Sequence, residues 1–314
     1  MKAVRFHDFG DPEVLRYEDV DQPTPGAGQV RVRVAATSFN PIDAGVRAGG
    51  MRGPMPVALP HTPGRDVAGA VDALGEGVTG LEIGAPVVGF LPMVEDGAAA
   101  EYVLMGADLL TAAPRDLPLA DAAALPLVGL TAWQALFDHG GLEAGQRVLV
   151  NGAGGAVGGY AVQLARWAGA HVVATASPRS AAAVKDAGAD EVVDHTSVEV
   201  TAAVTEPVDV VLNLAPVDPE RLAALTDLVR PGGVVVNTTV WMPAPTDEGR
   251  GVRGVNLFVR GDAEQLARLV ALVDGGELRV EIARRVPLAE LPALHAEAAA
   301  GGLPGKVVVL VPGA

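Results

Sequence analysis

The sequence contains no cysteine among its 314 residues, and this absence removes several kinds of chemistry. A chain without thiols forms no disulfide bridge, ligates no iron–sulfur cluster, binds no zinc through cysteine and has no thiolate nucleophile. Lysine is scarce too, because only three of the 23 basic residues are lysines: Lys2, Lys185 and Lys306. The acidic residues number 38. The net charge of −15 argues against a nucleic-acid-binding protein, because such proteins need a basic surface for phosphates.

Long apolar runs are also missing. No uninterrupted stretch approaches the roughly 20 residues that a membrane span needs, and the N-terminal sequence Met-Lys-Ala-Val-Arg-Phe-His has no signal-peptide pattern. Aromatic residues make up only 4%, whereas the hydrophobic fraction of 49% comes from alanine and valine spread between glycines. That composition suits a buried sheet. The length predicts about two domains, and the lack of a membrane span and of a signal-peptide pattern predicts a soluble, cytoplasmic protein.

The first third of the chain predicts short strands. Valine-rich segments alternate with proline and glycine clusters, a pattern typical of an antiparallel, barrel-like domain. The expected strands are residues 2–6, 29–35, 67–73, 85–90 and 101–105.

From residue 119 onward the pattern changes to alternating strands and helices, which favours a doubly wound parallel sheet of the Rossmann type. The expected strands there are residues 146–151, 171–176, 191–193, 209–214 and 233–238, and the expected helices are 119–127, 131–139, 157–168, 180–187, 220–229 and 263–274. Residues 242–254 resemble a linker, and strand character returns at 278–286 and 306–311. We therefore expect an α/β domain (119–277) inserted into a barrel-type β domain (1–118 and 278–314), with a ligand cleft between them.

A glycine-rich turn lies between the apolar strand that ends at Asn151 and the following helix. Gly152, Gly155 and Gly158 have G-x-x-G-x-x-G spacing. Small residues allow a tight turn, and a helix N-terminus offers backbone N–H groups to a pyrophosphate. We predict that this loop, including Ala156 and Val157, binds a dinucleotide, although a plain strand-to-helix turn would look similar.

The segment after the second strand of the α/β domain predicts the form of the cofactor. NAD-binding sites place an acidic residue here, about 20 residues after the glycines. This chain instead has Ser177 and Arg179, with no carboxylate nearby. An arginine can bind a 2′-phosphate through charge-assisted hydrogen bonds. We therefore predict NADPH as the cofactor, with an ordinary solvated arginine as the alternative.

Several segments together resemble a known family. They are residues 38–43 (Ser-Phe-Asn-Pro-Ile-Asp), 63–69 (Pro-Gly-Arg-Asp-Val-Ala-Gly), 124–132, the glycine loop, 185–190 and 305–308 (Gly-Lys-Val-Val). In this order they resemble the zinc-free quinone oxidoreductase (zeta-crystallin-like) branch of the medium-chain dehydrogenase/reductases. The resemblance implies a GroES-like catalytic domain, a Rossmann domain that binds NADPH, and a homodimer.

The resemblance also implies that zinc is not used. Zinc-dependent relatives carry a His-Glu pair where this chain has Arg65 and Asp66, and cysteines nearby. The six histidines here are scattered without the spacing of a metal site. Hydride transfer without a Lewis acid relies on positioning and hydrogen bonds.

Site residues follow from the same resemblance. Asn40 matches an asparagine that approaches the nicotinamide or substrate, and Thr131 matches a threonine at the nicotinamide ribose; each also fits a purely local role, in a turn and at a helix start. The backbone around Val240 and Phe258 matches the segments that hold the carboxamide. His195 matches a position near the adenosine phosphate, with an ordinary surface histidine as the alternative.

The expected function is NADPH-dependent reduction of a quinone or a similar conjugated carbonyl. An enoyl or alkenal double-bond reductase is the alternative, and a non-catalytic NADPH-binding, crystallin-like protein is a third. Gly45 replaces a tyrosine that many quinone reductases carry, which loosens the substrate assignment. Trp241 either lines the substrate cleft or makes a plain hydrophobic contact. Asp43 is expected to be a structural hydrogen-bond acceptor.

Overall fold

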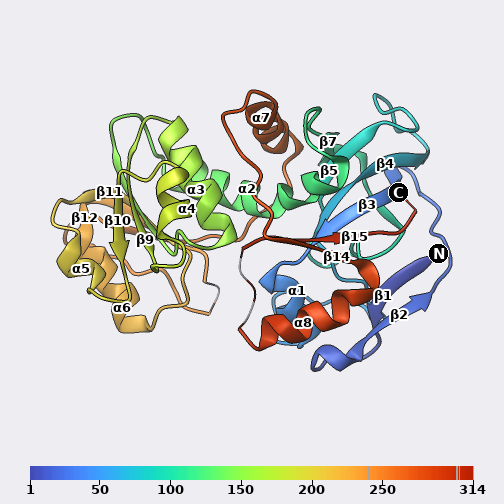
Figure 1. Ribbon diagram of the computed structural model, residues 1–314, viewed down its shortest axis with the longest axis horizontal. Coiled ribbons are helices and arrows are strands. Elements are labelled where there is room, and N and C mark those ends of the chain that lie inside the picture. Colours follow the sequence, from blue (N-terminus) through green and yellow to red (C-terminus); the bar gives the residue numbers. More distant parts are fainter. Residues whose placement is uncertain (240, 302, 304, 314) are drawn as a thin grey trace. The chain divides into compact units, whose positions relative to one another are not determined.

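The computed structural model describes residues 1–239, 241–301, 303 and 305–313 (Figure 1). The chain divides into two compact units. Unit 1 comprises Met1–Leu127, Arg260–Gly276 and Val280–Ala314. Unit 2 comprises Val128–Val259 and Glu277–Arg279.

Unit 2 contains a six-stranded parallel sheet in the order β10-β9-β8-β11-β12-β13. Its strands are β8 (Arg147–Asn151), β9 (His171–Ala176), β10 (Glu191–Asp194), β11 (Val208–Asn213), β12 (Val229–Asn237) and β13 (Arg253–Asn256). The strand order reverses between β8 and β11, as in a dinucleotide-binding sheet. This confirms the predicted Rossmann-type fold.

Helices cover the sheet of unit 2, with α3 and α4 packed on β8, β9 and β10 (Figure 1). The helices are α3 (Ala156–Trp167), α4 (Ala181–Asp186), α5 (Val200–Ala203) and α6 (Pro219–Ala224), and a 3₁₀ turn, Leu225–Leu228, packs on β11 and β12. Leu149, Val173, Val211 and Val235 are fully buried and belong to one hydrophobic core. The strands are apolar throughout because both faces of a parallel sheet are covered.

Unit 1 is built on a seven-stranded sheet in the order β14-β15-β3-β4-β5-β7, with β6 also paired to β3. Its strands are β3 (Gln29–Ser38), β4 (Asp66–Leu74), β5 (Pro86–Phe90), β6 (Tyr102–Gly106), β7 (Leu110–Ala112), β14 (Arg284–Pro287) and β15 (Val307–Leu310), and β1 (Lys2–Phe6) pairs separately with β2 (Leu15–Asp19). Its helices are α1 (Pro41–Arg47), α7 (Ala263–Asp274) and α8 (Leu291–Ala299). The sheet is antiparallel except for the pair β14–β15.

Two segments lie in unit 1 although the sequence placed them in the α/β domain. Residues 119–124 form a 3₁₀ helix that packs on β3 and β4. Helix α7 packs on β7, and the Arg115 backbone N–H donates to Asp274 Oδ1 at 2.8 Å. Helix α2 (Pro126–Trp133) continues into a π-helical turn, Gln134–His139, so the expected helix 131–139 has no separate start.

Further details differ from the expectation. The segment 242–254 is not only a linker, because β13 begins at Arg253 and an isolated bridge joins Asp247 and Val252. The strand expected at 278–286 begins only at Arg284. Helices α1 and α8 were not predicted, because each is short and begins with proline in its first turn.

Candidate active site

The glycine loop has the geometry of an anion-binding turn. Gly152 has φ +92°, and a Cβ atom there would lie 3.0 Å from the Ala215 backbone nitrogen. Helix α3 follows at once, with Gly155 as its N-cap. A Cβ atom at Gly158 would lie 2.5 Å from the Cα of Ala153, so the helix start lies directly against the turn. The first N–H groups of a helix have no partner within it, and together with the helix dipole they attract a phosphate.

The segment after β9 lies beside this loop. A Cβ atom at Gly154 would lie 2.4 Å from Ser180 Oγ, and Ser180 Oγ accepts from the Ser177 backbone N–H at 3.3 Å. Arg179 is exposed and, within the described part of the chain, makes no hydrogen bond or ion pair. Its guanidinium is therefore available to an anionic ligand at this place.

A cavity of about 380 Å³ lies at the carboxyl ends of the strands of unit 2. Gly152 and Thr175 line it from β8 and β9, His195 from beyond β10, and Ala215 from beyond β11. Sheets of this type bind their ligands at this edge. Gly152 and His195 therefore line the same cavity.

Among the described residues of unit 2, the other predicted ones do not line this cavity. Ala156 and Val157 are half-buried at the start of α3. Phe258 follows β13, is 57% exposed and does not line the cavity, and Trp241 is 68% exposed. Thr131 is buried within α2. Val240 lies outside the described residues.

In unit 1, Asn40 belongs to a buried polar network around Asp66. The Asp66 carboxylate accepts hydrogen bonds from Ser38 Oγ, Asn40 Nδ2, Lys306 Nζ and the Leu127 backbone N–H. Lys306 Nζ also donates to Asn40 Oδ1, and Asn40 Nδ2 donates to the Ser38 carbonyl at 3.4 Å. Asn40 is 1% exposed. Both ends of its amide are therefore held inside unit 1.

Asp43 links this network to the start of α1. Its Oδ2 accepts from the Asn40 backbone N–H at 3.1 Å and its Oδ1 from the Gly64 N–H at 3.0 Å. Asp43 is thus a structural acceptor, as expected, and it completes a capping box with Asn40. Burial raises the pKa of Asp43, while the Arg65 charge opposes that shift.

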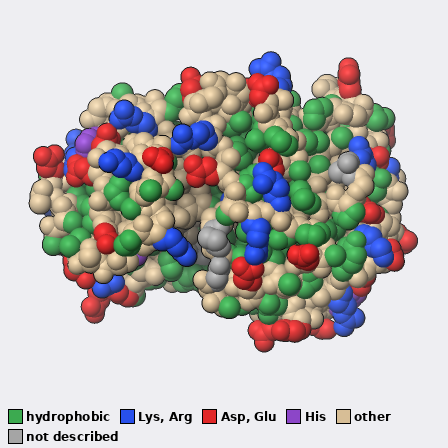
Figure 2. Space-filling view, in the orientation of Figure 1, with side chains coloured by type: hydrophobic (Ala, Val, Ile, Leu, Met, Phe, Trp, Pro, Cys, Tyr) green, Lys and Arg blue, Asp and Glu red, His purple; other side chains and the backbone are tan. Residues whose placement is uncertain are grey.

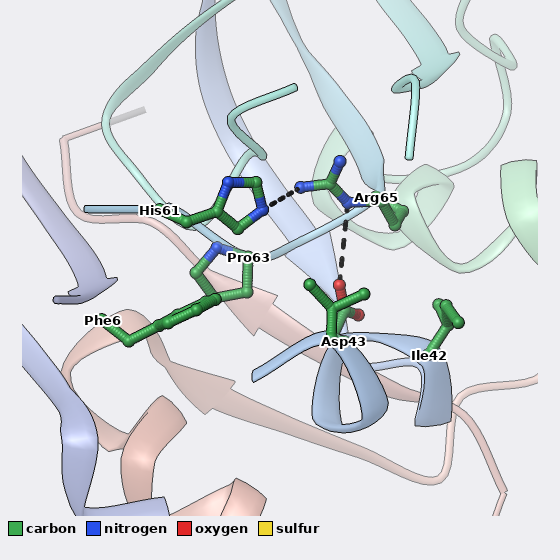
Figure 3. A pocket seen from close by; sticks show the side chains of 7 residues that line it. Phe6, Ile42, Asp43, His61, Pro63 and Arg65 are labelled. Carbon is green, nitrogen blue, oxygen red and sulfur yellow. Dashed lines mark hydrogen bonds and ion pairs between the residues drawn. The ribbon is translucent and has the colours of Figure 1, made fainter. Parts of the chain in front are cut away.

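A buried cation lies next to Asp43 (Figure 3). Arg65 Nε is 3.8 Å from Asp43 Oδ1, and Arg65 Nη2 is 3.4 Å from His61 Nε2. Arg65 Nη1 donates to the Glu95 carbonyl at 2.8 Å. Burial lowers the pKa of His61 to about 4, and the Arg65 charge acts in the same direction. His61 is therefore neutral at pH 7, and Arg65 is the fixed charge of this cluster.

Metal ligands and membrane spans can be assessed for the described residues. Among them, no three histidine, aspartate or glutamate side chains are grouped so that they could hold a metal ion. Nor does any helix in this part of the chain have the length and apolarity required to cross a bilayer. Positive and negative side chains are interspersed over the face seen in Figure 2.

Known proteins resemble this chain in sequence and in fold. Family models match residues 26–115 (alcohol dehydrogenase GroES-like domain) and 187–309 (zinc-binding dehydrogenase). The chloroplast envelope quinone oxidoreductase homolog of Arabidopsis thaliana is 34% identical over 325 residues, which cover 98% of each chain. The chain belongs to the quinone oxidoreductase family of the medium-chain dehydrogenase/reductases. The quinone oxidoreductase of Sus scrofa is also 34% identical, over 99% of this chain and 98% of its own.

Solved structures agree with membership of the quinone oxidoreductase family. The quinone oxidoreductase from Coxiella burnetii has a TM-score of 0.90 and 31% identity, with 99% of each chain covered. A mycobacterial protein solved with NADPH has a TM-score of 0.86 at 28% identity, over 99% of this chain and 100% of its own. The CurK enoyl reductase has a TM-score of 0.87 at 25% identity, over 99% of each chain. The chain is thus an oxidoreductase of an NAD(P)-binding family.

Two groups of site residues were not predicted from the sequence. One is the pair Asp66 and Lys306, for which the sequence indicates no mutual contact. The other is a row of asparagines at the strand ends of unit 2. Their signal was visible in the sequence, since Val-Asn or Leu-Asn ends four of the strands.

Proposed function

We propose that this protein is an NADPH-dependent reductase that transfers a hydride to a quinone or a similar conjugated carbonyl without using zinc. The observation that carries the proposal is 34% identity with quinone oxidoreductases over at least 98% of the chain. The geometry of unit 2 supports the cofactor part, because it combines an anion-binding turn with a cavity at the ligand-binding edge of the sheet.

The residues at this edge fit a dinucleotide. Gly152 and Gly155 leave room for the pyrophosphate, and the start of α3 at Ala156 and Val157 supplies its backbone donors. Ser177 and His195 lie in the segments that would border the adenosine half. When bound, NADPH supplies the hydride.

The 2′-phosphate is the basis for choosing NADPH over NADH. Arg179 is exposed and unpaired within the described residues, and no carboxylate occupies positions 177–180. A carboxylate there would bind the ribose hydroxyls of NADH and repel a phosphate. The mycobacterial structure solved with NADPH supports the same choice.

Zinc independence is proposed from the donor groups in unit 1. Asp66 already accepts from Lys306, Asn40, Ser38 and a backbone N–H. The neighbouring Arg65 is a buried cation, which disfavours a second cation beside it.

We further propose a positioning role for Asn40, because its amide is committed to Asp66 and Lys306. Thr131 stays proposed as a second residue of the reaction site, and the segments around Val240 and Phe258 stay proposed as parts of the cofactor site. A homodimer and a cytoplasmic location stay predictions. Analytical ultracentrifugation of the purified chain tests the first of these two.

NADPH oxidation by the purified protein tests the proposed reaction. The acceptors are a benzoquinone, an aliphatic enone and a trans-2-enoyl thioester, each compared by kcat/KM. The highest value for the quinone supports the proposal. The highest value for the enoyl thioester favours the double-bond reductase that the CurK likeness suggests. Tight NADPH binding with no turnover of any acceptor favours the non-catalytic alternative.

A further inference from the structure

Four strands of unit 2 end with asparagine at the same level of the sheet. In the strand register, Asn213 is paired with Asn151 on one side and with Asn237 on the other, and Asn237 is paired with Asn256. Their side chains form a row of hydrogen bonds, which we call the asparagine ladder. Asn151 Nδ2 donates to Asn213 Oδ1 at 2.8 Å, Asn213 Nδ2 to Asn237 Oδ1 at 2.9 Å, and Asn237 Nδ2 to Asn256 Oδ1 at 3.4 Å.

The ladder continues into the glycine loop through Thr175. The Gly152 backbone N–H donates to Thr175 Oγ1 at 2.8 Å, and Thr175 Oγ1 donates to Asn151 Oδ1 at 2.9 Å. Every step runs in the same direction, from Gly152 toward Asn256. Hydrogen bonds aligned in this way polarise one another, so the row acts as a unit.

Burial makes this arrangement expensive unless it is complete. Asn213 is 0% exposed, Asn237 1% and Asn151 4%. Burying an amide without hydrogen-bond partners costs free energy, whereas an apolar side chain at the same position would need no partner. No buried side-chain nitrogen or oxygen of these three residues lacks a partner among the described atoms. The buried amides of this row therefore depend on one another for their hydrogen bonds.

The same amides also hold the loops beyond the strands. Asn213 Nδ2 donates to the Ala215 carbonyl at 3.1 Å. Asn237 Nδ2 donates to the Met242 carbonyl at 2.8 Å, and Thr239 Oγ1 donates to Asn237 Oδ1 at 2.7 Å. These loops follow β11 and β12 at the edge where such a sheet binds its ligand.

The bond between Asn151 and Asn213 crosses the point where the strand order reverses. In a doubly wound sheet, each half on either side of that point holds one mononucleotide of the cofactor. Here β8, β9 and β10 form one half, and β11, β12 and β13 form the other. This one hydrogen bond therefore joins the backbone supports of the two cofactor halves.

We propose that the asparagine ladder is a positioning device for the dinucleotide. Asn151, with Thr175, fixes the glycine loop; Asn237 fixes Thr239 and Met242 beyond β12; and Asn213 links these two places. The inference rests on dinucleotide binding at this edge, as given under the proposed function, and adds residues that set the relative placement of the two cofactor halves.

Binding of a whole and a half cofactor tests the proposal. The dissociation constants of NADPH and of adenosine 2′,5′-bisphosphate are measured by calorimetry for wild type, Asn213→Val and Asn237→Val. We expect Asn237→Val to raise the Kd for NADPH about tenfold and to leave that for the bisphosphate within about twofold. Asn213→Val should raise both, because it also releases Asn151.

Val235→Ala is the matched control. Val235 is fully buried on β12, two residues before Asn237, and packs in the apolar core. Its truncation should lower the melting temperature without changing either Kd. If the asparagine variants lower the melting temperature as this control does and bind both ligands like wild type, the ladder is only structural and the proposal is wrong.

Asn213→Asp gives a readout that a packing role would not move. This nearly isosteric change places an acceptor opposite Asn237 Oδ1 and the Ala215 carbonyl. Protonation of the new carboxyl restores one donor, so its defect in NADPH affinity should shrink as the pH falls from 8 to 6. A defect that does not vary with pH contradicts the donor role of Asn213.

Hydrogen exchange on the free protein separates this inference from the proposed function. If wild type binds neither NADPH nor NADH, the cofactor assignment fails. The ladder is then decided by the amides of residues 152–158 and 239–242. Faster exchange in both segments of Asn213→Val, but not of Val235→Ala, supports the ladder as the link between them; unchanged exchange overturns it.

Discussion

Lys306 and Asp66 form a buried ion pair in unit 1. Lys306 Nζ lies 3.2 Å from Asp66 Oδ2, and the two side chains are 2% and 0% exposed. The partners are 240 residues apart in the sequence. Because Asn40 Oδ1 accepts from the same ammonium group, one lysine directly before the last strand, β15, holds both a carboxylate and an amide.

Removing this lysine should destabilise the protein strongly. Lys306→Met leaves the Asp66 carboxylate buried without its counter-charge, and breaking one partner of such a pair costs about 3–5 kcal/mol. Urea unfolding at pH 7 measures the loss. The control is Lys2→Met, which removes an exposed ion pair with Asp19 and should barely change the midpoint. The double variant Lys306→Met with Asp66→Asn should regain part of the loss; no regain would show that the pairing itself is unimportant.

Arg179→Ala should weaken NADPH binding more than NADH binding. Loss of charge-assisted hydrogen bonds to a 2′-phosphate corresponds to about a 10- to 100-fold rise in the Kd for NADPH. NADH lacks that phosphate, so its Kd should change little. Fluorescence titration with each cofactor gives both values. Arg166→Ala, which removes another exposed arginine of unit 2, is the control; equal losses for the two cofactors would refute the phosphate role of Arg179.

Two glycines of α3 should respond in opposite ways to alanine. At Gly158 a Cβ atom would lie 2.5 Å from the Ala153 backbone, so Gly158→Ala must push the helix away from the glycine loop. We expect weaker NADPH binding and a lower melting temperature. At Gly159 nothing lies within 4 Å, so Gly159→Ala should stabilise the helix by about 0.5–1 kcal/mol and leave binding intact. Equal behaviour of the two variants would contradict the close contact.

Stability should fall in acid partly because of His295. This residue is 1% exposed, its ring nitrogens have no partner among the described atoms, and it stacks edge-on against Phe39. Burial lowers its pKa to about 3, and the charge of Arg47 acts in the same direction. The unfolded chain takes up the proton near pH 6.5 and the folded chain does not, so stability is complete above that pH and declines below it. Between pH 7 and 5 the decline is about 2 kcal/mol.

The variant His295→Phe isolates this contribution. Unfolding free energies of wild type and variant are compared at pH 7 and pH 5. The loss on acidification should be smaller in the variant by about 2 kcal/mol, since the other titrating groups are shared. Equal losses would mean that His295 is protonated in the folded protein.

Local patterns were sufficient for much of the fold. Strand β9 and helix α7 begin and end where the sequence placed them, because their apolar residues are continuous or recur with the helical period. The glycine loop was also visible, since a strand, a turn and a helix follow one another within a few residues. Helix α1 was missed because its seven residues contain proline and glycine, and the capping box at Asn40 and Asp43 stabilises it instead.

Interactions between distant strands were beyond the reach of the sequence. The asparagine ladder exists only because β8, β11, β12 and β13 pair with their last residues side by side. Each asparagine alone is typical of a strand end followed by a turn. Likewise, neither Asp66 nor Lys306 indicates its partner, because the sheet order that joins β4 and β15 through β3 depends on the whole of unit 1.

The discontinuity of unit 1 has a consequence for synthesis of the chain on the ribosome. Unit 2 is nearly contiguous, whereas unit 1 needs β14 and β15 to complete its sheet. The cation that neutralises Asp66 is therefore made about 240 residues after the carboxylate. Domains fold as they emerge, and contacts of long sequence separation form slowly. We expect the nascent chain to fold its dinucleotide-binding unit first, while the N-terminal strands wait for β14, Lys306 and β15.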